Sequence, residues 1–559
     1  MIIKSIQIRG FRAIQELSLP FEPGLTTLVG ENGTGKSTIA LAFNTLASNC
    51  RSPQPMDPQN YPYGVFTPSS IEATFDLTSD EIFELVSPSV IPEACSSESK
   101  QLLAAWLHNQ GTEIKVTQPF PDASGHRNPA MTLGDLQFAG DRLGIGTDSN
   151  EGSAVAWTRE AIRIAESHSL IGDGLVSKSD AAQRMKNTFG VNRPTVADLG
   201  RFIQDHFKVL DDFRVRANLG SRSGAVESLT GADTASVLLN LKSHRMRDQS
   251  DRYNKITNTF TRFYPRFKIE AVEQVPGQGS PEVLFYESGR SSPLSYTQVS
   301  AGMQQVLTLI TNLVGREGLI FFLEHPEEHL HPHTMRAVQS LLYEYKERNQ
   351  IIVITHNSHF VDPRTPVGLR RVAYTLDKGA VAVTPHLPQE SPARDRCLGQ
   401  MGTALRRVGD REVVFARSVL LVEDESQQEF LTAVAPTLGY DIDSASVSII
   451  AVDGHDGYQA YQTVLEALEI PYIALRDKSW GHNPRYPADK FFSLDGELEE
   501  CLDNHELSEL RREVEKEVGT SKRRVAGLLG SRLSREQIPP IFDTVLQVAM
   551  RLSIANPQS

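Results

Sequence analysis

Runs of apolar residues without alternation recur along the chain, and each is followed by a polar or glycine-rich segment. Such runs predict strands buried on both faces, as in parallel sheets covered by helices. They occupy residues 25–29, 319–323, 351–354, 418–422, 447–452 and 470–475. Residues 2–11 alternate partly between apolar and polar positions and predict a further strand. Apolar positions at helical spacing lie between several of these runs, so the pattern predicts an α/β fold.

The middle third of the chain has a different pattern. Helical spacing over residues 157–167, 181–207 and 236–264 predicts a mainly helical insertion, useful for dimerisation or DNA contact. A polar, glycine-containing loop is predicted before it, at 125–152. Residues 245–268 carry basic side chains interleaved with aromatic ones, which is typical either of a solvated helix face or of a nucleic-acid surface.

Composition limits the class of protein. The hydrophobic fraction of 40% and the charged fraction of 22% are those of an ordinary globular protein. With 56 basic and 69 acidic residues the formal charge is −13, so any DNA contact must come from local basic patches. The 4 cysteines have no C-x-x-C spacing, which argues against a disulfide framework or a zinc site and suits a reducing cytosol. Neither a signal-peptide layout nor a run of about eighteen apolar residues is present, so we expect a cytoplasmic protein without a membrane span.

The segment 30–38, Gly-Glu-Asn-Gly-Thr-Gly-Lys-Ser-Thr, lies between an apolar run and a helical run. It matches the pattern G-x-x-x-x-G-K-[ST], in which backbone N–H groups and the positive end of a helix attract polyphosphate. Lys36 is expected to reach the β- and γ-phosphates of ATP, and the Ser37 hydroxyl to ligate Mg²⁺. The other candidate nucleotide contacts are Gly30, Asn32, Gly33, Gly35 and Thr38.

Three later segments follow the loop in the order seen in ABC-type ATPases. Residues 300–305, Ser-Ala-Gly-Met-Gln-Gln, resemble the signature motif of that family, in which the serine and glycine contact the γ-phosphate held by another head. Ser300 and Gly302 hold these positions. Glu324 ends a buried strand and resembles a Walker B acid that holds Mg²⁺. His356 follows the next buried strand and resembles the switch histidine that senses the γ-phosphate. The resemblance implies a homodimer whose two heads enclose two ATP molecules.

The residues after Glu324 indicate which group of ATPases the chain resembles. The run 325–332, His-Pro-Glu-Glu-His-Leu-His-Pro, resembles the corresponding run of the overcoming-lysogenization-defect (OLD) nucleases. His325 stands where that family has a glutamate, the expected base that orients water for hydrolysis. A histidine accepts a proton near neutral pH but offers no fixed negative charge, so we expect ATP binding with slow hydrolysis. Three histidines are close together here, but no second ligand cluster is near in sequence, which argues against a metal site in this run.

In the last third of the chain, three predicted strands lead to Glu423, Gly454 and Asp477. This order of strand–Glu, strand–Gly and strand–Asp resembles the TOPRIM domain of topoisomerases, primases and OLD nucleases. The resemblance implies acids at the carboxyl edge of one sheet that bind Mg²⁺ or Mn²⁺ for phosphoryl transfer. Lys522 is placed where the family has a lysine that steadies the scissile phosphate. The candidate catalytic acids and metal ligands are Glu423, Asp477, Ser479 and Glu499.

Several positions depart from the TOPRIM pattern, beginning with Asp424, where the family has a glycine after the first glutamate. Gln427 stands where an acid usually follows the first glutamate by four residues, and Ser479 takes the second position of an Asp-x-Asp pair. Losing two carboxylates is expected to weaken a two-metal site considerably. The nearby acids that are candidates to substitute are Glu425, Asp453 and Asp456.

These resemblances predict an ABC-type ATPase head at 1–155 and 266–392, a helical insertion at 156–265, a linker at 393–417 and a TOPRIM domain at 418–559. The function they imply is an ATP-controlled, metal-dependent DNA endonuclease in prokaryotic defence against phage. The alternative is a nucleotide-gated sensor or scaffold, weakened at both centres, that dimerises and controls an accessory defence protein. A repair ATPase of the recombination type is disfavoured because the chain has no long heptad arm.

Overall fold

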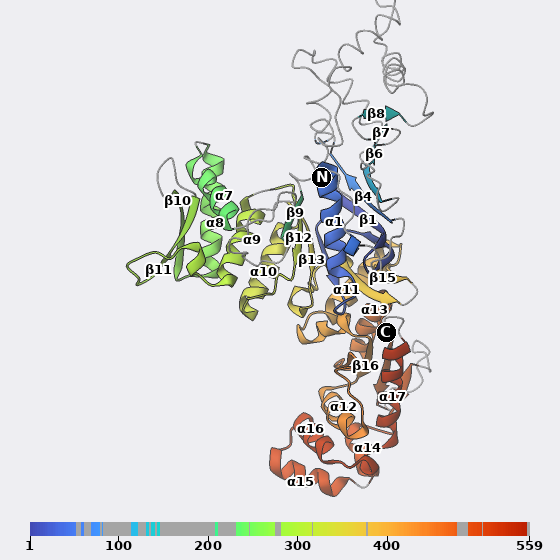
Figure 1. The fold of residues 1–559 in the computed structure, drawn as a ribbon. Helices are drawn as coiled ribbons and strands as arrows, with labels where there is room; N and C mark the ends of the chain where they lie inside the picture. The colour runs from blue at the N-terminus through green and yellow to red at the C-terminus, as the bar shows by residue number, and fades with distance from the viewer. Residues whose placement is uncertain are drawn as a thin grey trace, which may run out of the picture. The chain divides into compact units, whose positions relative to one another are not determined.

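The computed structural model describes residues 1–51, 58–60, 69–78, 81, 113–120, 130–133, 136–139, 142–145, 207–210, 231–244, 246–273, 281–315, 317–375, 378–477, 490–505 and 507–555 (Figure 1). They form two compact units, one of residues 1–26 and 37–355 and one of residues 27–36 and 356–559. The division falls within β3 (Leu25–Val29) and at the first residue of α1 (Lys36–Arg51). The phosphate-binding loop therefore belongs to the second unit, together with the predicted TOPRIM strands.

Antiparallel strands form one part of the first unit, with the strand order β8-β7-β6-β5-β4-β1-β2. Its strands are β1 (Ile2–Phe11), β2 (Ile14–Pro20), β4 (Ser69–Asp76), β5 (Glu113–Phe120), β6 (Ala130–Leu133), β7 (Leu136–Ala139) and β8 (Arg142–Ile145). The alternation in β1 is confirmed, since Ile3, Ile6 and Ile8 are buried. The loop predicted at 125–152 is wrong where β6, β7 and β8 form. Strands of four residues are too short for their pattern to stand out from the glycines and polar residues that join them.

Three parallel strands form another part of the first unit. β12 (Ile320–Glu324) lies between β13 (Gln350–Ile354) and β9 (Phe207–Leu210). The apolar side chains of β12 and β13 are all buried, which confirms the predicted runs. Helix α9 (Ala301–Gly315) precedes β12, and α10 (Pro332–Tyr345) connects β12 to β13. β9 is a strand of this sheet within the stretch predicted as a mainly helical insertion.

A lobe of two helices and a hairpin lies against α9 (Figure 1). It consists of α7 (Gly231–Ser243), α8 (Arg247–Phe263), β10 (Phe267–Glu273) and β11 (Pro281–Glu287). The helical prediction for 236–264 holds, but two helices form it, of which α7 ends at Ser243 and α8 begins at Arg247. The predicted helices at 157–167 and 181–207 lie outside the described residues, apart from Phe207 at the start of β9. Arg252 pairs with Asp248 at 3.3 Å and Arg266 with Glu287 at 2.7 Å, which favours a solvated helix face for the basic stretch.

The second unit contains a parallel sheet with the order β17-β16-β18-β19. Its strands are β16 (Ser418–Val422), β17 (Val447–Ala451), β18 (Tyr472–Arg476) and β19 (Phe491–Ser493). Leu420 and Val422 of β16 pack in one core, with α12 (Glu425–Leu438), α14 (Leu498–Asn504), α15 (Ser508–Val518), α16 (Lys522–Arg532) and α17 (Pro540–Ala555). Val419 and Leu421 pack in another, with α11 (Ser391–Ala404) and α13 (His455–Ala467). Both faces are covered, which explains why these strands show no alternation.

The phosphate-loop strand shares a core with this sheet. β3 pairs in parallel with β14 (Leu369–Thr375), which pairs antiparallel with β15 (Gly379–Val383). Val29 of β3 and Leu369 of β14 belong to the same buried cluster as Val419 and Leu421 of β16. The strand before the phosphate loop and the TOPRIM sheet therefore share one packed core. Among the helices in the described ranges, none combines the length and apolar character that a membrane span needs.

Candidate functional site

The phosphate-binding loop has the backbone that its glycines predict. Gly30, Gly33 and Gly35 have φ angles of 144°, 79° and 100°, which favour glycine. A Cβ at Gly30 would lie 2.1 Å from the carbonyl oxygen of Val372, so no other residue fits there. Lys36 begins α1, and its ammonium donates to the carbonyl oxygen of Gly30 at 2.9 Å. The loop therefore gathers around the Lys36 ammonium, as a polyphosphate site requires.

The remaining predicted nucleotide contacts lie on or beside this loop. Asn32 and Ser37 are exposed, whereas Thr38 is buried in the first turn of α1. His356 follows β13 with an exposed side chain. These positions are compatible with the predicted roles, which stay predictions.

An ion pair ties the loop to the TOPRIM sheet. Arg417, the residue before β16, donates through Nε to both carboxylate oxygens of Glu31, each at 2.9 Å. Arg371 of β14 is buried and donates to the carbonyl oxygens of Ala416 at 3.2 Å and Glu469 at 3.3 Å. The sequence did not predict these contacts, because Glu31 and Arg417 are 386 residues apart. They join the nucleotide loop to the amino end of the strand whose carboxyl end leads to Glu423.

In the first unit, the predicted Walker B acid ends β12 and is followed by a strained histidine. His325 has a φ of 48°, in the left-handed region, and its N–H donates to the carbonyl oxygen of Ile354 at 2.9 Å. Its Nδ1 lies 3.5 Å from Glu327 Oε1, and its Nε2 lies 4.0 Å from Glu324. The pKa of His325 is raised, first by its hydrogen bond to Glu327. Thr355 donates to the other Glu327 oxygen at 2.9 Å, so a fixed carboxylate supports His325. Sequence reasoning missed this role of Glu327.

The predicted signature motif opens α9. The N–H of Met303 donates to the Ser300 hydroxyl at 3.4 Å. A Cβ at Gly302 would lie 2.6 Å from the carbonyl oxygen of His329, so the close approach of the Walker B run itself requires a glycine. His331 caps α10 by accepting from the N–H of His333 at 3.3 Å. These contacts give the glycine and the histidine local structural roles.

The TOPRIM acids Glu423 and Asp477 follow two adjacent parallel strands, β16 and β18. The N–H of Asp477 donates to Glu423 Oε2 at 3.1 Å. Burial, followed by the charge of Glu423, raises the pKa of Asp477 from 3.8 to about 7. The structure therefore brings these two predicted residues together in a place where a positive charge is favoured. Ser479 and Lys478 lie outside the described residues.

Gln427 of α12 is buried between the two acids. Its Nε2 donates to Asp477 Oδ1 at 2.8 Å, and its Oε1 accepts from the N–H of Glu423 at 3.1 Å. Its own N–H donates to Asp424, which caps the helix. The amide therefore holds the ends of β16 and β18 together, a role that the sequence indicated only as the loss of a carboxylate.

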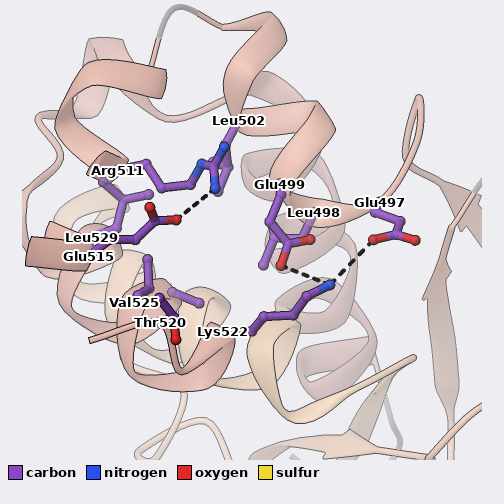
Figure 2. A pocket seen from close by; sticks show the side chains of 11 residues that line it. Glu497, Leu498, Glu499, Leu502, Arg511, Glu515, Thr520, Lys522, Val525 and Leu529 are labelled. Carbon is purple, nitrogen blue, oxygen red and sulfur yellow. Dashed lines mark hydrogen bonds and ion pairs between the residues drawn. The ribbon is translucent and has the colours of Figure 1, made fainter. Parts of the chain in front are cut away.

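Lys522 and Glu499 meet at the start of α16, beside a cavity of about 280 Å³ (Figure 2). The Lys522 ammonium lies 3.2 Å from Glu499 Oε1 and 3.4 Å from Glu497 Oε2. Glu499 raises the pKa of Lys522, so the lysine is positively charged. Sequence reasoning missed Glu497, although it begins the acidic run that contains Glu499. The apolar wall of the cavity is made by Leu498, Leu502, Val525, Ala526 and Leu529.

The acids that were candidates to substitute are engaged elsewhere where the structure describes them. Asp453 pairs with Arg407 at 2.6 Å, and Glu425 pairs with Arg523 at 3.0 Å. The side chain of Asp456 lies outside the described residues. Within the described part of the chain, no group of three or more His, Cys, Asp or Glu side chains is arranged to hold a metal ion. The two carboxylates of Glu423 and Asp477 are hard oxygen donors in a negative environment, and they fit a divalent ion.

A phosphate-loop ATPase joined to a TOPRIM domain is the class of protein that the fold and these residues define. Family models agree: an AAA ATPase domain matches residues 1–104, and an AAA domain described for the AbiEii toxin and Type IV TA system matches 175–362. The TOPRIM domain of overcoming lysogenization defect protein-like chains matches residues 414–478.

Two relatives over most of the chain are named OLD nucleases. It is 23% identical over 505 residues to an OLD nuclease of Thermus scotoductus, covering 85% of this chain and 82% of that protein. It is 21% identical over 496 residues to the Old nuclease of Escherichia phage P2, covering 85% of this chain and 77% of that protein. An SMC head bound to a ScpA domain covers 70% of this chain and 99% of its own, at 14% identity and a TM-score of 0.41. The predicted resemblance to the OLD family and the predicted fold class are confirmed.

Proposed function

We propose that this chain is an ATP-controlled endonuclease that cleaves DNA with Mg²⁺ or Mn²⁺ at the TOPRIM centre. The observation that carries the proposal is the pair Glu423 and Asp477, held together at the carboxyl edge of β16 and β18 where negative charge favours a cation. Two relatives that match 85% of the chain are named OLD nucleases, which supports the same conclusion.

The TOPRIM residues divide the work of phosphodiester cleavage. When bound, a divalent ion supplies Lewis acidity that neutralises phosphate charge and activates water. Glu423 and Asp477 hold that ion, with Ser479 as a further candidate ligand. Lys522 supplies a positive charge for the scissile phosphate, and Glu499 holds the Lys522 side chain in place.

The ATPase residues control this centre. We propose that Gly30, Asn32, Gly33, Gly35 and Thr38 bind the phosphates through the loop and first helical turn. Lys36 neutralises the phosphates, and Ser37 and Glu324 hold their Mg²⁺. His325, supported by Glu327, orients water, and His356 senses the γ-phosphate. A second copy supplies Ser300 and Gly302, so the working form is a homodimer, acting in the cytoplasm against phage DNA.

A sensor or scaffold that controls an accessory defence protein is the second candidate. The replacement of acids by His325 and Gln427 favours it, because both changes remove negative charge from centres that bind cations. Such a protein binds ATP and dimerises but cleaves nothing.

Supercoiled plasmid separates the two candidates. Purified protein is incubated with Mg²⁺ or Mn²⁺, with and without ATP, beside a Lys36→Ala variant. Metal-dependent nicking that ATP changes in the wild type but not in Lys36→Ala supports the nuclease. Tight ATP binding with no nicking under either metal rejects it in favour of the sensor.

A further inference from the structure

The turn that follows β12, residues 325–329, has an unfavourable backbone conformation at both of its ends. His325 has a φ of 48° and His329 a φ of 57°, both in the left-handed region that residues other than glycine rarely adopt. Within the turn, the N–H of Glu328 donates to the carbonyl oxygen of His325 at 3.1 Å. Strained residues of this kind persist only where the surrounding structure holds them. The turn therefore needs contacts from another element.

Helix α9 supplies contacts at both ends of this turn. The side chain of Gln305 is only 3% exposed, and its Nε2 donates to the carbonyl oxygen of Pro326 at 3.1 Å. Pro326 directly follows His325 in the chain. At the other end, Gly302 packs so closely that a Cβ there would lie 2.6 Å from the carbonyl oxygen of His329. One helix thus holds the backbone beside both histidines.

The same helix carries the predicted signature serine at its start. The carbonyl oxygen of Ser300 accepts from the N–H groups of Met303 and Gln304, at 3.0 and 3.1 Å. Ser300 is therefore bonded into the first turn of α9, and Gln305 lies in the next turn. The element that presents the serine is the element that holds the turn at 325–329.

We propose that Gln305 is a positioning residue for ATP hydrolysis, whose amide holds the turn at 325–329 and couples the nucleotide contact of Ser300 to His325. The inference rests on the proposed function, because it concerns the hydrolysis assigned there to His325. It explains why a buried amide on α9 bonds to the backbone next to the residue that orients water. It also gives one head a route from its contact with the other head's nucleotide to its own hydrolytic residue.

ATP turnover of the full-length protein tests the role of the amide. Phosphate release is measured in the wild type and in His325→Glu, so that a slow wild-type rate does not limit the comparison. Gln305→Met keeps the length of the side chain but cannot donate to Pro326, and Gln305→Asn keeps the amide but is one methylene shorter. We expect kcat to fall about tenfold in each, the effect of one lost hydrogen bond, with unchanged KM and unchanged affinity for a fluorescent ATP analogue.

The matched control is Asn312→Leu. Asn312 is another buried amide on α9, but its Nδ2 donates to the carbonyl oxygen of Thr308 in the same helix, at 2.7 Å. Its replacement removes a buried amide from α9 without removing the bond to Pro326, so kcat should stay at the parent value.

A double-mutant cycle tests the coupling to the serine. Ser300→Ala should lower kcat because it removes the contact with the γ-phosphate. If both residues act through the turn at 325–329, Ser300→Ala combined with Gln305→Met should be no slower than the slower single variant. Losses that multiply would reject the coupling.

The remaining outcomes separate this inference from the proposed function. A kcat within about twofold of the parent in both Gln305 variants would overturn the inference and leave ATP hydrolysis standing. A loss of analogue affinity as large as the loss of kcat would overturn it as well, because it assigns Gln305 a structural role. Absence of turnover in the wild type and in His325→Glu alike would reject both the inference and the hydrolytic role proposed for His325.

Discussion

Removing the charge of Asp477 should stabilise the metal-free protein, and only at higher pH. The pKa of this carboxyl is raised from 3.8 to about 7, first by burial and then by Glu423 and neighbouring acids. A raised pKa means that the folded state prefers the protonated form. The stability that the protonated carboxyl contributes is fully present at pH values below the pKa that Asp477 has in the unfolded chain. It is lost as the pH rises through about 7, the pKa in the folded state. Asp477→Asn keeps an acceptor for Gln427 but cannot ionise, so it avoids this loss.

The size of the effect follows from the shift. A rise of about three pKa units corresponds to about 4 kcal/mol at 1.4 kcal/mol per unit. The carboxyl is only half buried, and solvent screening reduces the figure to about 1–2 kcal/mol. For a unit of this size, that difference raises the melting temperature by about 2–8 °C.

Thermal unfolding in the presence of a chelator measures the difference. At pH 8 the Asp477→Asn variant should melt above the wild type, and at pH 4 the two should converge. Added Mn²⁺ should stabilise the wild type and leave the variant almost unchanged. An equal shift at both pH values, or a variant less stable at pH 8, would refute the electrostatic account of this centre.

Four further predictions concern the two centres. Gly30→Ala should abolish binding of a fluorescent ATP analogue, because its Cβ would lie 2.1 Å from the carbonyl oxygen of Val372; binding within threefold of the wild type would contradict this. Arg417→Ala should preserve ATP affinity but remove the effect of ATP on plasmid nicking, because it breaks the ion pair with the loop; an unchanged ATP response would reject that link. His325→Glu should raise ATP turnover at least about tenfold in a phosphate-release assay, since it supplies a fixed negative charge, and an equal or lower rate would count against it. Gln427→Glu combined with Ser479→Asp should raise metal-dependent nicking, and no gain would favour the sensor.

The sequence was most informative where function depends on neighbouring residues. The phosphate loop is formed by residues that are adjacent in the sequence, and its glycines predict the positive φ angles that the backbone adopts. The buried runs of β12, β16 and β18 were predictable because both faces of a parallel sheet are covered. Family resemblance then ordered these strands into an ATPase and a TOPRIM domain, which the family models confirm.

The contacts that set the chemistry were not predictable, because they join distant residues. Gln427 and Asp477 are 50 residues apart, and nothing in either segment indicates an amide bridge. The pairing of Lys522 with Glu497 depends on how α16 packs beside the start of α14. The contact between His325 and Glu327 depends on the backbone turn after β12, and the sequence analysis did not predict it. Each of these contacts depends on how helices and strands pack against one another, which a single sequence does not specify.

We propose that Glu423 and Asp477 form the metal centre of a DNA endonuclease. The most direct test of this proposal is nicking of supercoiled plasmid in Mn²⁺ by the wild type, Glu423→Ala, Asp477→Ala and Glu429→Ala. Glu429 is the matched control, an acid on α12 that pairs with Arg523. We expect nicking by the wild type and Glu429→Ala, and none by the other two variants. Nicking that survives loss of Glu423 or Asp477 would contradict it.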